Sequence, residues 1–142
     1  IIADTIKLKI FAPDKSLLSD DEVNNSSIVA KLTYNKFSML LTGDAEKASE
    51  EIMLKQYGSE LKSNVLKSGH HGSNTSSSSK FLKAVGAESV VISLGAGNDY
   101  HHPHPSTLKK YEQEKLKVYR TDQDGTVTIT SDGNSYNITK EK

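Results

Sequence analysis

The run Ser89–Gly95, SVVISLG, constrains the fold more than any other stretch because almost all of it is apolar. A strand without a polar face has to be covered on both sides, as in the centre of a sheet that carries packed helices. Segments with helical spacing lie before and after this run, at Ser76–Val85 and Ser106–Glu114. We therefore predict a layered α/β domain, with this run as a central strand.

The remaining elements are predicted from the spacing of apolar residues and from turn residues. Tight hairpins are expected around Asn35-Lys36 and around Asp132-Gly133, so the sheet should be mixed. The helix Ala45–Tyr57 is expected to face inward through Ala48, Ile52 and Leu54. The predicted strands are Thr5–Phe11, Ser27–Tyr34, Phe37–Gly43, Asn64–Ser68, Lys117–Thr121 and the two arms of the hairpin within 125–139, and residues 14–27 are predicted to form a loop.

Composition narrows the chemistry that the chain can support. Its 142 residues suit one domain, and the 18 basic residues balance the 18 acidic ones, which argues against a general electrostatic grip on nucleic acid. The chain has no cysteine, so any transition metal would be held by His, Asp, Glu or Asn, a set that favours zinc, manganese or iron. No apolar run approaches the length of a membrane span, and no signal peptide is recognised.

The five histidines lie in two loops that each follow a predicted strand. Loops at the carboxyl ends of strands gather on one edge of such a sheet, and Asp44 also follows a strand directly. We therefore expect Asp44, His70 and His102 to converge. Carboxylates and imidazoles that hold cations can make a bound water acidic, as in metal-assisted hydrolases. The histidines are His70 and His71 in one loop and His101, His102 and His104 in the other.

Each of these features has a simpler explanation. An aspartate at a strand end, such as Asp44, is commonly the N-cap of the next helix. The segment HHPHP can form a rigid turn, and clustered histidines can also bind a metal without any functional role. Gly72 and Ser73 suit anion binding, because a glycine lets backbone N–H groups approach a phosphate and a serine adds a donor, but they also suit an ordinary loop.

Successive blocks of the sequence, taken in order, resemble one known domain. They are NNSSIVAKLTYNKFSMLLTGDAE, LKSGHHGSNTSSSSKFL, VVISLGAGNDYHHPHPSTLKKY and KVYRTDQDGTVTITSDG. The chain from Asn24 onward resembles the metallo-β-lactamase-like domain at the C-terminus of the ComEC DNA-uptake protein family and of related secreted hydrolases. The resemblance implies a four-layer αββα sandwich and two divalent metal ions, zinc or manganese.

The resemblance also implies roles for individual residues. Asp44 in TGD corresponds to the metal-bridging aspartate of the family, and His70 corresponds to a ligand of the second metal. His71 would then lie close enough to touch the metal or a phosphate. His102 corresponds to the histidine of the family's His-Pro pair, which implies substrate binding, proton donation or ligation. His71 and His102 are therefore the candidates to assist the leaving oxygen.

Three further residues are expected to contact the substrate. Gly72 and Ser73 follow the paired histidines and would bind a phosphate. Asn25 is included because Asn24 and Asn25 fall where many relatives place another metal-binding histidine. These assignments come from the resemblance and from local chemistry together.

The chain departs from the family in one respect. The primary motif, His-x-His-x-Asp-His, is absent, and no histidine precedes His70. The resemblance therefore implies that residues 1–142 are the C-terminal half of the sandwich, without its N-terminal half. We expect an incomplete metal site, little activity in isolation, and an uncovered apolar sheet face that favours self-association.

The function expected of the intact parent is metal-dependent hydrolysis of phosphodiesters, including nucleic acid, during DNA uptake at an extracytoplasmic location. The alternative is a non-catalytic module that binds anions or a partner through a degenerate site. A third possibility is a sequence-independent nucleic-acid binder, for which a local group of lysines would contact the backbone. The zero net charge argues against it, and a solvated helix face explains these lysines more simply. Those lysines are Lys62, Lys67, Lys80 and Lys83.

Overall fold

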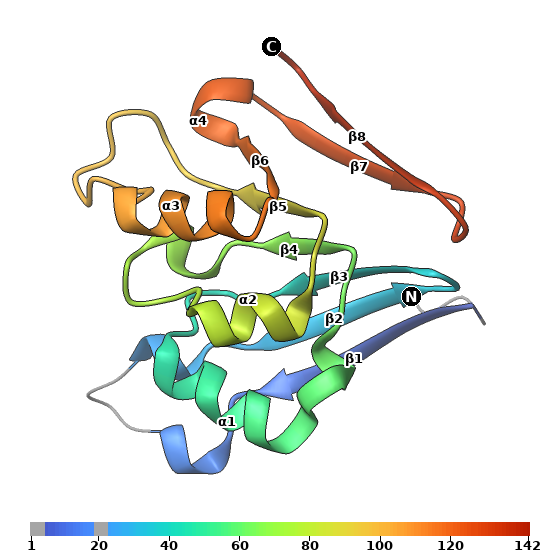
Figure 1. Cartoon of the computed structure of the whole chain (residues 1–142), viewed down its shortest axis with the longest axis vertical. Coiled ribbons are helices and arrows are strands. Elements are labelled where there is room, and N and C mark those ends of the chain that lie inside the picture. The colour runs from blue at the N-terminus through green and yellow to red at the C-terminus, as the bar shows by residue number, and fades with distance from the viewer. Residues whose placement is uncertain (1–4, 19–22) are drawn as a thin grey trace.

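A computed structural model describes residues 5–18 and 23–142, which contain a mixed six-stranded sheet (Figure 1). Strands β1 to β6 lie in chain order, with antiparallel pairing from β1 to β3 and parallel pairing from β3 to β6. Strands β7 and β8 form a separate antiparallel hairpin. The strands are β1 Ile6–Ala12, β2 Val29–Tyr34, β3 Phe37–Leu41, β4 Val65–Lys67, β5 Ser89–Ile92, β6 Lys117–Arg120, β7 Val127–Ser131 and β8 Tyr136–Lys140.

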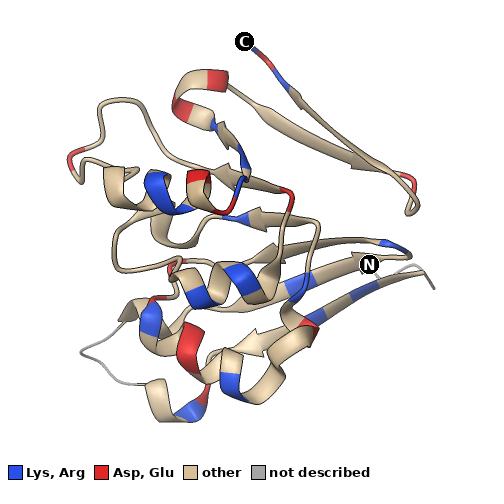
Figure 2. Ribbon diagram, viewed as in Figure 1, with Lys and Arg blue, Asp and Glu red and all other residues tan. Residues whose placement is uncertain are grey.

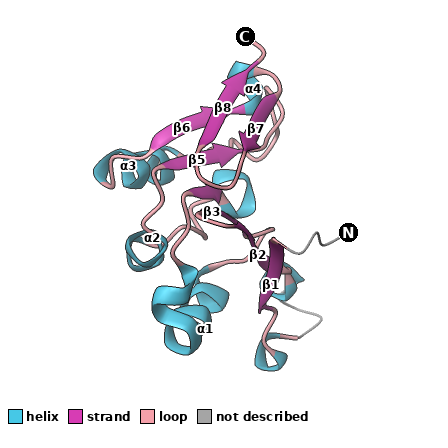
Figure 3. Cartoon of the chain, turned by 90° about the vertical axis from the view of Figure 1, so that its right-hand side faces the viewer, coloured by secondary structure: helices cyan, strands magenta, loops and turns pink. Residues whose placement is uncertain are grey.

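The main sheet is covered by helices on one face and by a β-hairpin on part of the other (Figure 3). Helices α1, α2 and α3 lie on one side of the main sheet, and the β7–β8 hairpin lies on the other side (Figure 3). The mixed α/β class and the mixed sheet are therefore confirmed, while the four-layer sandwich stays a prediction. The α-helices of the described residues are α1 Lys47–Tyr57, α2 Ser79–Val85, α3 Pro105–Gln113 and α4 Thr121–Asp124, and 3₁₀ turns occur at Lys15–Leu17, Val23–Ser26, Gly58–Leu61 and Gly69–Gly72.

Two apolar clusters lie on opposite faces of the sheet, because successive strand residues point to opposite sides. Leu66 of β4 and Val90 of β5 belong to the cluster under the helices, which includes Phe81 and Tyr111. Their strand neighbours Val65 and Val91 belong to the other cluster, against which the β7–β8 hairpin packs. The four residues of β5 are all buried, so the prediction of a central strand covered on both faces is confirmed.

Both predicted hairpins are present. Strands β2 and β3 pair through Tyr34 and Phe37 across the turn at Asn35-Lys36. Strands β7 and β8 pair through Ser131 and Tyr136 across the turn that contains Asp132 and Gly133. Turn chemistry is local, which explains why the sequence located these two features closely.

Two helices begin later than predicted. Helix α1 begins at Lys47 rather than Ala45, because Asn25 Oδ1 accepts from the backbone N–H groups of Glu46 and Ser49, at 3.2 and 3.3 Å. Helix α2 begins at Ser79 rather than Ser76, with the Ser78 hydroxyl as its N-cap. The start of α1 is thus fixed by a side chain distant in sequence. At α2 the local cap is supported by a distant one, because the Glu50 carboxylate accepts from Ser78 N at 2.9 Å.

The predicted inward face of α1 is wrong at Ala48 and Ile52, whereas Leu54 packs against the core as predicted. The buried residues of this helix are Ser49, Glu50 and Met53, whereas Ala48 and Ile52 are only half-buried. Glu50 turns inward because its carboxylate accepts from the backbone N–H groups of Ser77 and Ser78, at 2.5 and 2.9 Å. Burial of a carboxylate that is bonded in this way rotates the helix away from the apolar pattern.

Two other segments differ from their predictions. Residues 14–18 and 23–27, expected to be loop, contain two 3₁₀ turns, and the first is capped by Asp14, which accepts from Ser16 N at 2.9 Å. The part of that expected loop at 19–22 lies outside the described residues. Strand β6 ends at Arg120, because Thr121 begins α4 and its hydroxyl donates to Leu94 O at 2.8 Å.

The β1 end of the sheet leaves apolar side chains in solvent. Leu8 and Ile10 of the edge strand β1 are 51% and 52% exposed, and Leu41 of β3 is 37% exposed. Side chains alternate between the two faces along a strand, and the strand pairing puts these three on the same face as Leu32 and Met39. The β7–β8 hairpin covers another part of that face. Within the described residues, no helix is both long and apolar enough to cross a membrane.

Candidate functional site

The loops that follow β3, β4 and β5 meet at one edge of the sheet, because these strands run parallel. Backbone hydrogen bonds join the three loops to one another. His70 N donates to Gly43 O at 3.1 Å, and His104 N donates to Gly72 O at 2.9 Å. The predicted aspartate and both histidine segments are therefore held against each other by main-chain contacts.

A cavity of about 600 Å³ opens at this edge of the sheet. Five of the residues predicted to form a site line it, namely Asp44, His70, His71, Ser73 and His102. Asn24 and Tyr100 complete its lining. The expected convergence of Asp44, His70 and His102 is therefore found in the structure.

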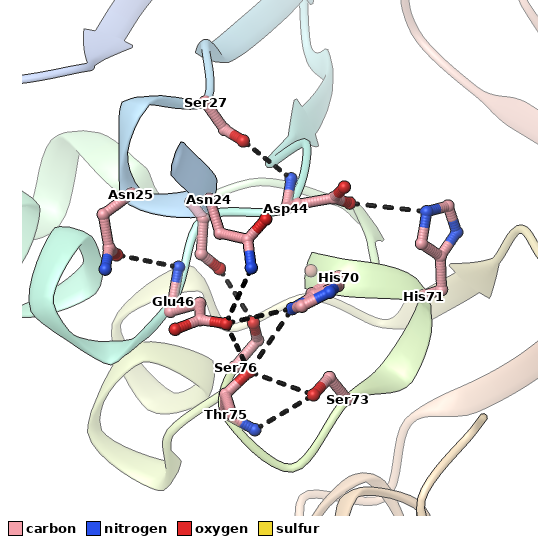
Figure 4. A network of polar contacts seen from close by, with 12 residues as sticks. Asn24, Asn25, Ser27, Asp44, Glu46, His70, His71, Ser73, Thr75 and Ser76 are labelled. Carbon is pink, nitrogen blue, oxygen red and sulfur yellow. Dashed lines mark hydrogen bonds and ion pairs between the residues drawn. The ribbon is translucent and has the colours of Figure 1, made fainter. Parts of the chain in front are cut away.

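His71 and Asp44 face each other across this cavity (Figure 4). His71 Nδ1 lies 2.5 Å from Ser93 O, and since a carbonyl oxygen only accepts, Nδ1 carries the proton. In a neutral ring, Nε2 is then an acceptor, and it lies 3.4 Å from the acceptor Asp44 Oδ1. Two acceptors at this separation are stable with a proton or a cation between them.

His70 pairs with a different carboxylate, Glu46, which the sequence analysis missed (Figure 4). Its Nδ1 lies 3.1 Å from Glu46 Oε1, so an ionised Glu46 requires the proton on Nδ1 and leaves Nε2 as the acceptor. The same oxygen accepts from Thr75 Oγ1 at 2.9 Å and from Asn24 Nδ2 at 3.1 Å. Glu46 is therefore fixed by three side chains from two segments, Asn24 in one and His70 and Thr75 in the other.

The backbone at the paired histidines is strained. His70 has φ 45° and His71 has φ 52°, both in the left-handed region that residues with a Cβ rarely occupy. Ser73 N donates to His70 O at 2.8 Å and helps to hold this turn. Strain of this kind persists where the surroundings impose it, and it is concentrated at functional sites.

Three predicted substrate contacts have structural partners of their own. Ser73 is buried, and its hydroxyl lies 2.9 Å from Thr75 Oγ1. Asn25 is buried at the start of α1, where it accepts from backbone N–H groups, and it does not line the cavity. Gly72 has φ 84°, and a Cβ at this position would lie 2.7 Å from Pro103 Cβ. Gly72 therefore permits the close approach of the two histidine loops.

His102 lies deepest among the histidines of the second loop. Its Nδ1 is buried and has no hydrogen-bond partner in the described part of the chain. Its ring centroid is 5.7 Å from that of His70. Burial lowers the pKa of His102, and the nearby His70, His71 and His104 lower it further. This environment favours the neutral imidazole, which can accept a proton or bind a cation.

The other two histidines of this loop do not line the cavity. His104 is the N-cap of α3, where its Nδ1 accepts from Ser106 N at 3.2 Å. His101 is exposed and has φ 55°. The histidine-proline segment is therefore partly a helix start, which neither the rigid turn nor the metal site predicted for it describes.

The four lysines considered as a nucleic-acid contact do not form one group. Lys80 and Lys83 are exposed on α2, whereas α1 and α3 carry charges of both signs (Figure 2). Lys62 lines a separate cavity. Burial lowers the pKa of the Lys67 ammonium, and the Asp44 carboxylate opposes that shift. The lining of the candidate site includes none of the four.

The sequence offered weak signals for the residues that were missed. Glu46 stands two positions after Asp44 and could have been read as a second carboxylate at the same strand end. Thr75 stands directly before the run of serines at 76–79, which is typical of a helix cap. Tyr100 stands directly before the histidine-proline segment. Their roles depend on contacts between loops, which local patterns do not encode.

Comparison with known proteins gives similarity to much longer chains. No family model matches. The chain is 39% identical over 104 residues to ComE operon protein 3 of Bacillus subtilis, covering 73% of this chain and 13% of that protein. It is 38% identical over 122 residues to competence protein ComA of Neisseria gonorrhoeae, covering 86% and 17%. It is 35% identical over 124 residues to recombination protein 2 of Haemophilus influenzae, covering 87% and 15%. The chain thus spans about a sixth of the length of these relatives, and the similarity supports its relationship to one segment of the competence protein family.

Proposed function

We propose that this chain supplies part of a metal-dependent site that hydrolyses phosphodiester bonds of DNA during uptake. The observation that carries the proposal is the opposition of two acceptors, His71 Nε2 and Asp44 Oδ1, at 3.4 Å. A divalent cation between them would satisfy both, and the histidine and carboxylate donors suit zinc or manganese. The similarity to a protein named competence protein ComA supports a role in DNA uptake, and an extracytoplasmic place of action is part of the proposal.

The donor set fits only part of such a site. Among residues 5–18 and 23–142, no group of three His, Asp or Glu side chains is placed to hold a metal ion. Zinc sites in enzymes commonly use three protein ligands, so a complete centre requires donors from outside this part of the chain. This agrees with the expectation that the N-terminal half of the domain provides the primary motif.

The roles proposed for the residues follow from their surroundings. Asp44 and His71 would hold one cation, and His70, with Nδ1 fixed by Glu46, would present Nε2 to the cavity. A bound cation would acidify a water molecule and polarise a phosphoryl oxygen. His102, kept neutral by burial, would exchange a proton with the leaving oxygen. Ser73 at the cavity wall would orient the phosphate.

Cleavage of DNA by the longer parent protein tests this proposal. We expect hydrolysis to depend on manganese or zinc, and Asp44→Ala to lower the rate by about 100-fold or more. Glu51→Gln on the exposed side of α1 is the matched control and should leave the rate unchanged. Cleavage that proceeds in the presence of a chelator, or that survives Asp44→Ala, would contradict the proposal.

The second candidate is a non-catalytic module that binds an anion or a protein partner. The absence of three converging metal donors in the described residues favours it. Calorimetric titration of the parent protein with zinc and with manganese separates the two candidates. Binding of either metal that Asp44→Ala abolishes supports the hydrolase, and lack of binding by the parent supports the module.

The partner proposed for the apolar sheet face is the N-terminal half of the same domain. Leu8, Ile10 and Leu41 leave apolar surface exposed on this face, and the relatives are about six times longer than this chain. Sedimentation of the isolated chain, alone and with the N-terminal half added, tests this pairing. A stable complex of the two halves supports it, whereas a dimer of this chain alone would favour self-association through the same face.

A further inference from the structure

A second cavity, of about 300 Å³, adjoins the candidate site. The two cavities share the rings of His71, Tyr100 and His102 as part of their lining. A molecule that fills both would therefore pass these three rings. The volume lies at the lower end of the range for small-molecule sites, which suits one ring system rather than a folded partner.

Two polar side chains of this second cavity, Asn98 and Thr121, are already engaged. Asn98 Nδ2 donates to Gly95 O at 3.1 Å and to His102 O at 2.8 Å, and its Oδ1 accepts from His102 N at 2.9 Å. Thr121 Oγ1 donates to Leu94 O and accepts from Leu94 N, both at 2.8 Å. Asn98 and Thr121 therefore shape the wall, but few of their donors and acceptors remain available to hydrogen-bond a ligand.

The remaining wall is formed by Leu94, by the rings of His71, Tyr100 and His102, and by Ser93 and Gly95. Tyr100 is 80% exposed although it is a large ring. Tyr100 stacks on His102, with ring centroids 5.9 Å apart and an interplanar angle of 25°. The stacked pair holds one face of Tyr100 and leaves the other free. An exposed, positioned ring of this kind is a platform on which planar bases stack without regard to sequence.

We propose that the second cavity binds a nucleobase next to the phosphodiester that the first cavity receives. This inference rests on the proposed function and adds to it the contact with the base. Since every base has a flat face that can stack on Tyr100, the four bases should bind alike. A base inside a duplex cannot reach Tyr100 and Leu94, so the substrate is a single strand or a strand end.

Three probes test the inference by NMR titration of the full chain: thymidine, deoxyribose 5-phosphate and thymidine 5-phosphate. Thymidine and its phosphate should both shift the resonances of Leu94, Tyr100 and Thr121. Deoxyribose 5-phosphate lacks the base and should leave unchanged the resonances of Leu94 and Thr121, which line the second cavity and not the first. The Tyr100→Ala substitution should lower the affinity for thymidine 5-phosphate by about tenfold, whereas Tyr100→Phe should leave that affinity unchanged.

The outcomes separate this inference from the proposed function. Equal binding of thymidine 5-phosphate and deoxyribose 5-phosphate, or unchanged affinity in Tyr100→Ala, overturns the base site and leaves the hydrolytic proposal standing. Thymidine shifts that persist when the parent shows no metal-dependent cleavage support the base site and overturn the hydrolytic proposal. Spectra of each variant without ligand establish that it is folded, and absence of thymidine binding by the folded wild-type chain overturns the base site.

Discussion

Two glutamates at the start of α1, one helical turn apart, have opposite surroundings. Glu50 is buried, and both of its oxygens accept from backbone N–H groups, those of Ser77 and Ser78. Glu46 is partly exposed, and one of its oxygens contacts the side chains of His70, Thr75 and Asn24. Glu50 therefore fixes the course of the main chain, whereas Glu46 sets the state of a side chain that lines the cavity.

The difference teaches that residue type alone does not identify a functional carboxylate. Both glutamates come from the same segment of the chain and both contact the segment between β4 and α2. What separates them is whether the partner is a backbone amide, which cannot change its state, or an imidazole, which can. Substitutions at the two positions should accordingly change stability in one case and the chemistry of His70 in the other.

The largest expected effect is on folding, from Glu50→Ala. Removing the carboxylate leaves two backbone N–H groups without their acceptor, each at a cost of about 1–3 kcal/mol. We expect the free energy of unfolding to fall by about 2–4 kcal/mol, measured by urea denaturation. A loss below about 0.5 kcal/mol would mean that water replaces the carboxylate, and the proposed contrast with Glu46 would fail.

The next effect is a pH dependence of stability that originates at Glu50. Burial raises the pKa of this carboxyl above its ordinary value of 4.5, despite the hydrogen bonds from Ser77 and Ser78 and the nearby Lys110. Between 4.5 and the raised value, the folded state keeps a proton that the unfolded state releases. The contribution of Glu50 to the free energy of unfolding should therefore fall as pH rises through this interval.

Urea denaturation over a pH series, with wild type and Glu50→Gln compared, measures this contribution. The variant cannot ionise at this position, so the difference in stability between the two proteins should change across the interval in favour of the variant as pH rises. A difference that is independent of pH would show that ionisation of Glu50 is not linked to folding.

The smallest change in stability is expected from Glu46→Ala, which should alter His70 instead. Without the carboxylate, Nδ1 loses the acceptor that keeps its proton there, and both neutral tautomers of His70 should be populated. Nitrogen-15 chemical shifts of the imidazole measure the tautomer directly. The free energy of unfolding should change by no more than about 1 kcal/mol.

Glu50→Gln is the matched control for this measurement, because it alters the neighbouring carboxylate on the same helix. It should leave the tautomer of His70 unchanged. If Glu46→Ala also leaves His70 with its proton on Nδ1, then Thr75, whose hydroxyl lies 3.4 Å from that nitrogen, would be the group that fixes the ring.

Much of the fold was predictable because the signals were local. The apolar run at Ser89–Gly95 required a strand covered on both faces, and the turns at Asn35-Lys36 and Asp132-Gly133 defined two hairpins. The helix around Ser106–Glu114 was found within one residue, since Pro105 marks its start. Helices α1 and α2 were extended too far because their starts depend on Asn25 and on Glu50, which are distant in sequence.

The candidate site divides in the same way. The sequence by itself determined that Asp44, the paired histidines and His102 follow strands, and parallel strand order is enough to gather them at one edge. Only the tertiary structure decided which side chains meet. His71 faces Asp44, His70 contacts Glu46, and Tyr100 stacks on His102. Strand ends follow from periodicity along one segment, whereas the partner of each side chain depends on the left-handed turn at His70 and His71 and on the packing of three separate loops.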